Sequence, residues 1–212
     1  SKPYSAVLLI GDGLGPAYVA AARHSRPSGV ELALDRMPHT AMVQTHSASH
    51  LVTDSAAAAT AMACGELTTN SALGQDASAR PDSPGKRIEN LAEWAADRGI
   101  LVGVVTNTAV TDATPAAWYA HTHHWHDERA NAQQSRKSRL SFLLGGGAKY
   151  MPEGEDWSPW QVVRDPSRLP SGPATPEMRV LGLFAHEHLP YENPREQLQL
   201  RLRALAEWGL RA

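Results

Sequence analysis

The sequence predicts an α/β fold with a central, mostly parallel sheet flanked by helices. Short, wholly apolar runs such as Ala6–Ile10, together with the β-branched run Ile100–Val105, are typical of strands buried on both faces. Segments with helical character stand between these runs, and the order strand, helix, strand favours parallel crossover connections. The 212 residues are enough for one sizeable domain, so we expect a single α/β domain over residues 1–212.

Composition and charge exclude several classes of protein. Apolar residues make up 42% of the chain and charged residues 20%, which excludes collagen-like, coiled-coil and wholly disordered chains. A net charge of -2 gives no electrostatic basis for nucleic-acid binding, so we expect no nucleic-acid partner. No apolar run reaches the roughly 18 residues of a membrane span. The single cysteine, Cys64, excludes a disulfide within the chain.

Strands and helices alternate along the first half of the chain. The strand Ala6–Ile10 ends at the turn Gly11–Gly15, and the alanine-rich segment that follows predicts a helix. Gly65 fits the end of a second alanine-rich helix, and a later cluster of Asp, Ser, Pro and Gly predicts a surface loop. These elements cover Pro16–Arg23 (helix), Thr40–Ser47 (strand), Ser55–Cys64 (helix) and Gln75–Gly85 (loop).

The second half repeats the alternation. Helical spacing of apolar residues ends at Gly99 and precedes the strand Ile100–Val105. Pro115 suits a first helical turn, so Asp112 or Thr114 would cap a helix running toward His121. The remaining elements are a helix through Ile88, Leu91, Ala92 and Ala95, a strand at Leu143–Leu144 turning at Gly145–Gly147, an irregular stretch Met151–Pro176, a strand Val180–Phe184, and an amphipathic helix through Leu198, Leu202 and Leu205 to Ala212.

Asp12 is a candidate metal ligand. It stands between two glycines at the carboxyl end of the first predicted strand, where ligands gather in open α/β sheets. A carboxylate at that edge suits a divalent cation, and the glycines let an ion approach the backbone closely. Capping of the next helix is an equally plain role for Asp12.

Ser55 is a candidate nucleophile. It opens the alanine-rich helix after Thr53 and Asp54, so its hydroxyl would meet free backbone N–H groups and the positive end of the helix dipole. Such a position favours an alkoxide or an anionic substrate, although a plain capping serine occupies it equally well. The chain has no Gly-x-Ser-x-Gly motif, which disfavours an ordinary serine hydrolase.

Asp112 and Thr114 present two oxygens two residues apart, a spacing that can place both on one hard cation. A capping turn is the alternative. The histidines after this segment invite a zinc assignment, but adjacent residues on a helix point apart, so we interpret them as a solvated helix end. They are His121, His123, His124 and His126, and we assign no site to His186 or His188 either.

Taken together, these segments resemble the alkaline phosphatase family. Leu8–Gly15 resembles the opening metal motif of that family, and Val52–Gly65, extended by Thr69–Gly74, resembles its nucleophile signature. Gly103–Thr106 through Val110–Ala117, ending at His121, resembles its third motif. Weaker landmarks at Leu143–Gly147 and Leu181–Ala185 follow in the same order, so the resemblance runs from about Ala6 to Tyr191.

The resemblance implies a phosphomonoesterase that uses two Zn²⁺ ions and one Mg²⁺ ion. Ser55 would be the nucleophile that forms a phosphoserine and also a metal ligand, and Asp12 would bridge zinc and magnesium. Asp112 and Thr114 would serve the magnesium side, and Asp54 would support these residues from behind. A metal-bound serine oxygen ionises at milder pH, which is the chemistry that such a site needs.

Two departures from the family pattern limit what the chain itself supplies. An ungapped count from Asp112 places Trp125 where the family carries a phosphate-binding arginine, with Arg129 nearby in sequence. A missing guanidinium fork should weaken phosphate binding. The remaining zinc ligands and the magnesium glutamate of the family have no counterpart in this sequence. Asp35 and His39 have the interval of one pair of zinc ligands, but they precede Ser55 in the chain. The predicted fold is therefore incomplete at its C-terminal side.

The sequence thus favours the N-terminal portion of a periplasmic or secreted alkaline phosphatase, with weak or no activity as an isolated chain. The start at Ser1, without a leader, matches a trimmed secretory precursor and equally a fragment. A non-catalytic scaffold or partner domain of the same fold is the alternative, and a third reading is another metal-dependent phosphate or sulfate ester hydrolase. A phosphate monoester is the expected small-molecule partner, and a homodimer is a possible assembly.

Overall fold

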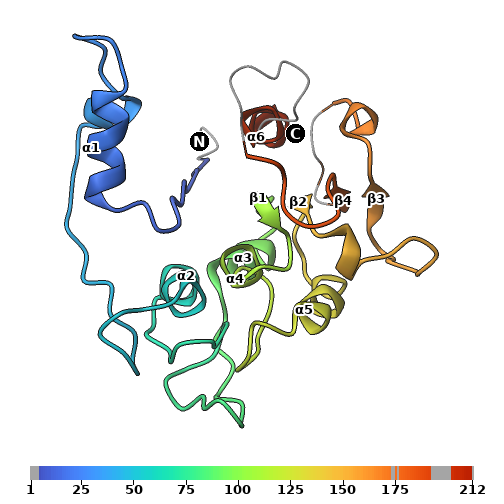
Figure 1. Cartoon of the computed structure of the whole chain (residues 1–212). Coiled ribbons are helices and arrows are strands. Elements are labelled where there is room, and N and C mark those ends of the chain that lie inside the picture. The colour runs from blue at the N-terminus through green and yellow to red at the C-terminus, as the bar shows by residue number, and fades with distance from the viewer. Residues whose placement is uncertain (1–4, 173–174, 176, 192–201, 212) are drawn as a thin grey trace. The chain divides into compact units, whose positions relative to one another are not determined.

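The computed structural model describes residues 5–172, 175, 177–191 and 202–211 (Figure 1). The chain forms two compact units, Ser1–Gln44 and Thr45–Ala212. In the described part of the chain, no helix is both long and apolar enough to cross a bilayer.

The described part of the N-terminal unit, residues 5–44, contains one α-helix and one short 3-10 helix. Helix α1 (Pro16–His24) begins with the predicted proline in its first turn, where the missing N–H costs no hydrogen bond. The 3-10 helix η1 (Ala33–Arg36) carries Asp35, which accepts a hydrogen bond from Arg23 Nε at 3.0 Å. This contact ties the two helices of the unit together.

The strands predicted at Ala6–Ile10 and Thr40–Ser47 do not form, and these two predictions are wrong. Residues 6–10 are irregular, and Leu9 is 80% exposed. A strand exists only where a neighbouring strand satisfies its backbone groups, and the described part of this unit contains no second strand. The apolar pattern alone therefore overestimated the tendency of these residues to form strands.

The C-terminal unit is built on a four-stranded parallel sheet in the order β1-β2-β4-β3. Strand β2 (Phe142–Gly146) lies between β1 (Gly103–Ala109) and β4 (Val180–Leu183), and β3 (Gln161–Val163) completes the far edge. In register, Gly103 pairs with Phe142, and Phe142 pairs with Val180. The prediction of a mostly parallel sheet flanked by helices is confirmed.

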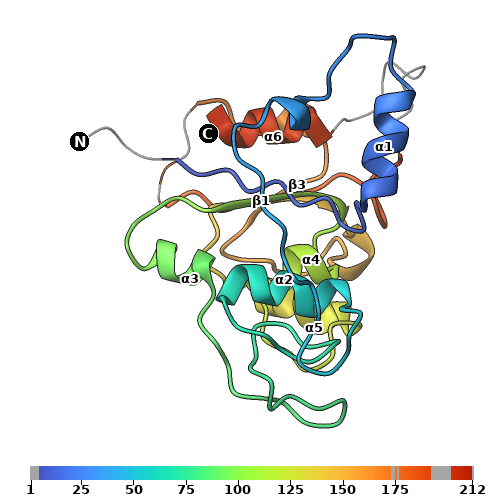
Figure 2. The ribbon, with the colours of Figure 1, turned by 90° about the vertical axis from the view of Figure 1, so that its left-hand side faces the viewer.

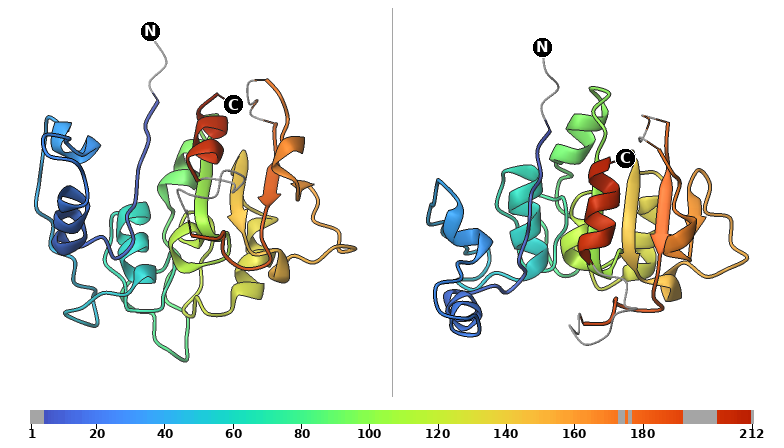
Figure 3. Two further views of the ribbon diagram at one scale, coloured as in Figure 1. Left: turned by 45° about the horizontal axis from the view of Figure 1, so that its top comes forward. Right: turned by 90° about the horizontal axis from the view of Figure 1, so that it is seen from above.

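Helices cover both faces of this sheet (Figure 2). Helices α2 (Ser55–Cys64), α4 (Ala113–Ala116) and α5 (Glu128–Ser135) lie on one side, and α6 (Leu202–Arg211) lies on the other. Figure 3 shows α6 lying over one face of the sheet, with its axis roughly along the strands. Helix α3 (Leu91–Ala96) packs against α2. Further short 3-10 turns are η2 (Ala148–Tyr150) and η3 (Pro166–Arg168).

Side chains of the central strands alternate between the two layers, as the period of two in a strand requires. Leu143 and Leu181 belong to the core cluster on the α2, α4 and α5 side, whereas Leu144 and Val180 belong to the cluster that includes Leu205 of α6. All five are at most 1% exposed. Burial of each such leucine contributes about 1.5–3 kcal/mol, so both layers stabilise the sheet.

Close approach of two backbone segments explains the glycines at the end of β2. A Cβ on Gly146 would lie 1.9 Å from the carbonyl oxygen of Glu187, and Gly147 has a φ of +98°. The Gly147 N–H donates to the same oxygen at 2.6 Å. The glycines of the landmark Leu143–Gly147 therefore allow the 185–188 loop to cross directly over the strand end.

Several predicted elements form with shifted bounds. The strand expected at Ile100–Val105 is β1, three residues later, and the helix expected from Asp112 toward His121 ends at Ala116. The final helix is described from Leu202 to Arg211, while Leu198 and Ala212 lie outside the described residues. The helices at Pro16–His24 and Ser55–Cys64 and the strand Val180–Leu183 are confirmed within one residue.

One α-helix and one strand of the described residues were missed. Helix α5 has a polar sequence that lacks an apolar face, so periodicity gave no signal for it. Strand β3 lies inside the stretch Met151–Pro176 that was expected to be irregular, because three residues are too few to show a strand pattern.

Candidate active site

The N-terminus of α2 is held by Asp54, which caps the helix. The Asp54 carboxylate accepts the Ala57 N–H at 2.8 Å through Oδ1 and the Ser71 N–H at 2.7 Å through Oδ2. Ser55 is the first residue of the helix and is half-buried. Because the capping role belongs to Asp54, the alternative that Ser55 is only a cap loses its main support.

The loop that follows α2 returns to this helix terminus at Ser71. Ser71 has a φ of +72°, a conformation that non-glycine residues rarely adopt. Its N–H donates to Asp54, and its carbonyl accepts the Trp125 N–H at 3.0 Å. Both hydrogen bonds help to hold this costly conformation, and they link the start of α2 to the segment between α4 and α5.

Asp112 caps α4, as one of the two sequence alternatives predicted. Its carboxylate accepts the Ala113 N–H at 2.8 Å, and both Asp112 and Thr114 are half-buried. Helices α2 and α4 pack against each other, so the segments that carry Ser55 and Asp112 belong to one packed layer. The capping and metal-binding readings of Asp112 remain compatible, since a carboxylate has further lone pairs for an ion.

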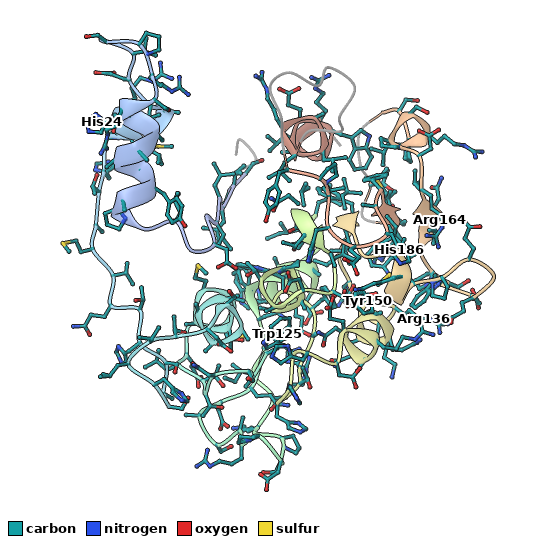
Figure 4. The ribbon with its side chains drawn as sticks, in the orientation of Figure 1. His24, Trp125, Arg136, Tyr150, Arg164 and His186 are labelled. Carbon is teal, nitrogen blue, oxygen red and sulfur yellow. The ribbon has the colours of Figure 1, made fainter. Side chains whose placement is uncertain are left out.

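The sequence analysis missed a polar network beside Asp112, centred on Glu128. Glu128 accepts the Thr111 hydroxyl at 2.6 Å and the Tyr150 hydroxyl at 2.7 Å, and Tyr150 lies next to α5 in Figure 4. Burial and the hydrogen bond to Glu128 raise the pKa of Tyr150. The Tyr119 hydroxyl donates to the Val110 carbonyl at 2.8 Å, and burial raises its pKa as well. These phenols therefore act as protonated donors.

Asn131 connects the two halves of this region. Its amide nitrogen donates to the carbonyl of Thr111 at 3.1 Å and to the carbonyl of Trp125 at 2.8 Å, and the residue is fully buried. The backbone beside Asp112 and the backbone of Trp125 are thus fixed to one side chain. No sequence signal could have singled out Asn131, because an asparagine in a polar helix is ordinarily solvated.

Neither Trp125 nor Arg129 is placed to replace a phosphate-binding arginine. Arg129 donates to both carboxylate oxygens of Glu155 at 2.6 Å and to the Tyr150 carbonyl at 2.6 Å, so its guanidinium is already engaged. Trp125 is half-buried, and the centre of its ring lies 3.9 Å from the centre of the His126 ring. Neither side chain offers a guanidinium fork to this site.

The histidines after α4 differ in their surroundings, and the interpretation of all four as a solvated helix end is wrong. None of them lies in a helix, and the side chain of His121 is only 10% exposed. His124 and His126 are exposed, with ring centres 5.3 Å apart. Farther along the chain, His188 Nδ1 accepts the Ala109 N–H at 2.9 Å, which assigns it a structural role.

Asp12 lies in the N-terminal unit, on the turn just before α1. The Leu14 N–H donates to the Gly11 carbonyl at 3.1 Å, and Gly13 has a φ of +66°. The helix is capped by Gly15 without a side-chain hydrogen bond, so Asp12 is not the cap of α1. Its role as a metal ligand stays a prediction, as do those of Ser55, Asp112 and Thr114.

The described residues contain no group of three or more His, Cys, Asp and Glu side chains placed to hold a metal ion.

Cys64 is not a candidate for catalysis. Burial, with added repulsion from Glu93 and Glu66, raises the pKa of its thiol to about 11. A thiol with so high a pKa is a poor nucleophile near neutral pH.

The chain resembles known proteins over most of its length. A model of the alkaline phosphatase family matches residues 5–210. The streptomycin-6-phosphate phosphatase of Streptomyces griseus is 35% identical, with 89% of this chain aligned to 49% of that protein. The tissue-nonspecific alkaline phosphatase of Gallus gallus is 32% identical, with 68% of this chain aligned to 33% of that protein.

Solved structures agree with these sequence matches. The cold-active alkaline phosphatase of Shewanella sp. superposes with a TM-score of 0.75 at 31% identity, covering 86% of this chain and 46% of that one. The alkaline phosphatase of the Antarctic bacterium TAB5 gives a TM-score of 0.76 at 26% identity, covering 94% and 58%. The chain thus spans half or less of the length of these curated relatives, and over that span it belongs to the alkaline phosphatase family.

Proposed function

We propose that this chain contributes the nucleophile half of a phosphomonoester hydrolase, with Ser55 as the nucleophile. The observation that carries the proposal is the placement of Ser55 as the first residue of α2, behind a cap made by Asp54. Backbone N–H groups at a helix N-terminus favour the oxygens of a phosphate. Family membership supplies the reaction class, and the activity of the whole protein is part of the proposal.

In the proposed reaction the Ser55 oxygen attacks phosphorus and forms a Ser–O–P bond while the bond from phosphorus to the alcohol oxygen breaks. The alcohol leaves with a proton, and water then cleaves the phosphoserine to give inorganic phosphate. Asp54 orients the start of α2 through its two backbone hydrogen bonds. Asn131 and Glu128 hold the segment that carries Asp112 and Thr114.

Divalent metals are part of the proposal, as Zn²⁺ and Mg²⁺ bound with the help of Asp12, Ser55, Asp112 and Thr114. When bound, such ions would lower the pKa of the serine hydroxyl and neutralise charge on the phosphate. One solved relative, a variant of the TAB5 enzyme, has magnesium bound in its M3 site.

These four residues offer carboxylate and hydroxyl oxygens only. That donor set suits magnesium, but it does not fill two zinc sites, which favour nitrogen or sulfur ligands as well. We therefore derive no step through zinc from this chain alone. The remaining ligands would have to come from other parts of the protein or from a partner.

Phosphate release from an aryl phosphate, with Zn²⁺ and Mg²⁺ supplied, tests the proposal. We expect weak turnover that Ser55→Ala abolishes and Ser83→Ala, on an exposed loop, leaves unchanged. Equal rates for the unmodified chain and Ser55→Ala would overturn the assignment of the nucleophile. Turnover as fast as that of a complete phosphatase would instead show that the ligands of this chain suffice.

A non-catalytic scaffold is the second candidate, and the Trp125 region favours it. Arg129 is held by Glu155, and Trp125 offers no charge to a phosphate, so substrate binding would be weak. Calorimetric titration with Zn²⁺ separates the candidates. Tight binding of two or more equivalents by this chain would contradict both the scaffold and the incomplete-site readings.

A periplasmic or secreted location and a homodimeric state complete the proposal. Cell fractionation of the full-length protein, and light scattering of the purified chain, would test the two separately.

A further inference from the structure

His121 stands between two oxygen atoms, one on each side of its ring. Nδ1 lies 2.8 Å from the carbonyl oxygen of Gly74, and Nε2 lies 2.9 Å from Oε1 of Glu93. A carbonyl oxygen and a carboxylate both accept hydrogen bonds, so each ring nitrogen has to donate. A neutral imidazole has only one N–H, whereas the imidazolium has two. The His121 side chain is only 10% exposed, so an unprotonated ring nitrogen that faced an oxygen would be largely shielded from water.

The Nε2 side of the His121 ring faces a carboxylate, that of Glu93. Glu93 also accepts the Arg87 guanidinium at 2.5 Å through Oε1 and the Asn90 N–H at 3.1 Å through Oε2. Burial pushes the pKa of Glu93 upward, but the hydrogen bonds from His121 and Asn90 outweigh it, so the pKa lies below its usual range. Cys64 of α2, whose pKa is raised by burial and by the nearby Glu93, keeps its proton. Glu93 is thus an anion that contacts both the Arg87 guanidinium and the His121 ring.

This contact joins segments that carry the proposed catalytic residues. Gly74 follows Ser71, whose N–H donates to Asp54, the cap of α2, and the Gly74 N–H donates to Thr60 Oγ1 of that helix at 3.1 Å. His121 follows α4 by five residues, and its N–H donates to Gln134 of α5 at 2.8 Å. Backbone hydrogen bonds between Leu73 and Thr122, at 2.7 and 2.9 Å, run beside it.

We infer that His121 is a positioning residue: protonated on both ring nitrogens, it holds the loop after α2 against the segment after α4 by donating to Gly74 and Glu93. The effect of this contact on catalysis rests on the proposed function, but the contact of His121 with Gly74 and Glu93 does not. The inference therefore has a readout that needs no turnover.

The protonation state is visible in a long-range ¹H–¹⁵N spectrum of the chain labelled with ¹⁵N-histidine. The signals of His121 are assigned by their loss in His121→Gln. We expect this spectrum, recorded at neutral pH, to show two protonated nitrogens on His121. One protonated and one bare nitrogen on His121 would overturn the inference.

Glu93→Gln separates charge from shape, because glutamine keeps the size and can still hydrogen-bond. We expect His121 to become neutral, with the proton on Nδ1 facing Gly74, and exchange of the Ser71 amide hydrogen to become about tenfold faster. Glu89→Gln, at an exposed glutamate nearby, should change neither. An unchanged His121 signature and unchanged Ser71 exchange in Glu93→Gln would contradict the inference.

Gly74→Ala tests the other side of the ring. A Cβ there would lie 2.3 Å from His121 Nδ1, and the residue has a φ of +57°. Gly99→Ala is the matched control, since Gly99 has a φ of +70° and no atom within 4 Å of its Cβ position. We expect only Gly74→Ala to remove the doubly protonated signature. If the unmodified chain shows the doubly protonated His121 but no turnover that depends on Ser55, the proposed function is overturned and the inference about His121 stands.

Discussion

Asp54 accepts the backbone N–H of Ser71, 17 residues later in the chain, at 2.7 Å. The same carboxylate accepts the Ala57 N–H at 2.8 Å, so one side chain both starts α2 and closes the loop that follows it. The order of the nucleophile signature, with its Thr69–Gly74 extension, thus has a physical reason. The extension returns to the helix terminus and fixes the residue next to Ser55.

Asp54→Ala should destabilise the C-terminal unit by about 2–3 kcal/mol, since it removes a helix cap and leaves the Ser71 N–H without its partner. Urea denaturation followed by circular dichroism measures the change. Asp127→Ala is the control, because Asp127 caps α5 through a single hydrogen bond to the Ala130 N–H at 2.9 Å. We expect that variant to lose only about 1 kcal/mol. Equal losses would mean that the bond to Ser71 contributes nothing.

The sequence predicted the parts of this fold whose signals are local. The alanine-rich helix α2, its end at Gly65 with a φ of +73°, and the strand Val180–Leu183 follow from propensity, glycine chemistry and apolar runs. The proline in the first helical turn predicted a cap at Asp112 or Thr114, and Asp112 is the cap of α4. The residues that determine each of these elements lie within a few positions of one another in the sequence.

What the sequence could not predict depends on partners that are distant along the chain. Ala6–Ile10 has the composition of a buried strand but no neighbouring strand among residues 5–44, the described part of its unit. His121 differs from His124 only because Gly74 and Glu93 lie beside it, and these are 47 and 28 residues away. Asn131 bridges two carbonyl groups that are apart in sequence, so composition gave it no distinction.

Trp125→Arg should strengthen phosphate binding if Trp125 stands where the family places its arginine. A guanidinium can donate two parallel hydrogen bonds to a phosphate, so we expect at least about a tenfold lower Kd for inorganic phosphate in the presence of Mg²⁺. Isothermal titration calorimetry measures the affinity. Trp94→Arg, at a tryptophan of α3 that is 41% exposed, is the control and should leave the Kd unchanged. No gain in Trp125→Arg, with the fold intact, would show that this segment is not part of a phosphate site.

Cys64 should react slowly with alkylating reagents at neutral pH. Because burial raises the pKa of its thiol to about 11, the thiolate fraction near pH 8 is on the order of one in a thousand. The rate of iodoacetamide labelling, followed by mass spectrometry, should rise with pH up to about 11. The urea-unfolded chain is the internal control and should react as an ordinary cysteine. A folded-state inflection near the ordinary value of roughly 8.5 would contradict the burial of this thiol.

Glu93 should make stability depend on pH in the acid range. Its pKa in the folded chain lies below the usual value, because hydrogen bonds from His121 and Asn90 outweigh the effect of burial. The stabilising contribution of Glu93 is therefore present above the pKa of the unfolded state, and it is lost as the pH falls through the folded-state value. We expect the difference in unfolding free energy between the unmodified chain and Glu93→Gln to shrink steadily from pH 6 toward pH 3. Urea titrations at each pH measure it, with Glu89→Gln as the control whose difference stays near zero. A difference that grows toward acid pH would mean that burial dominates and that the carboxylate is not held by its donors.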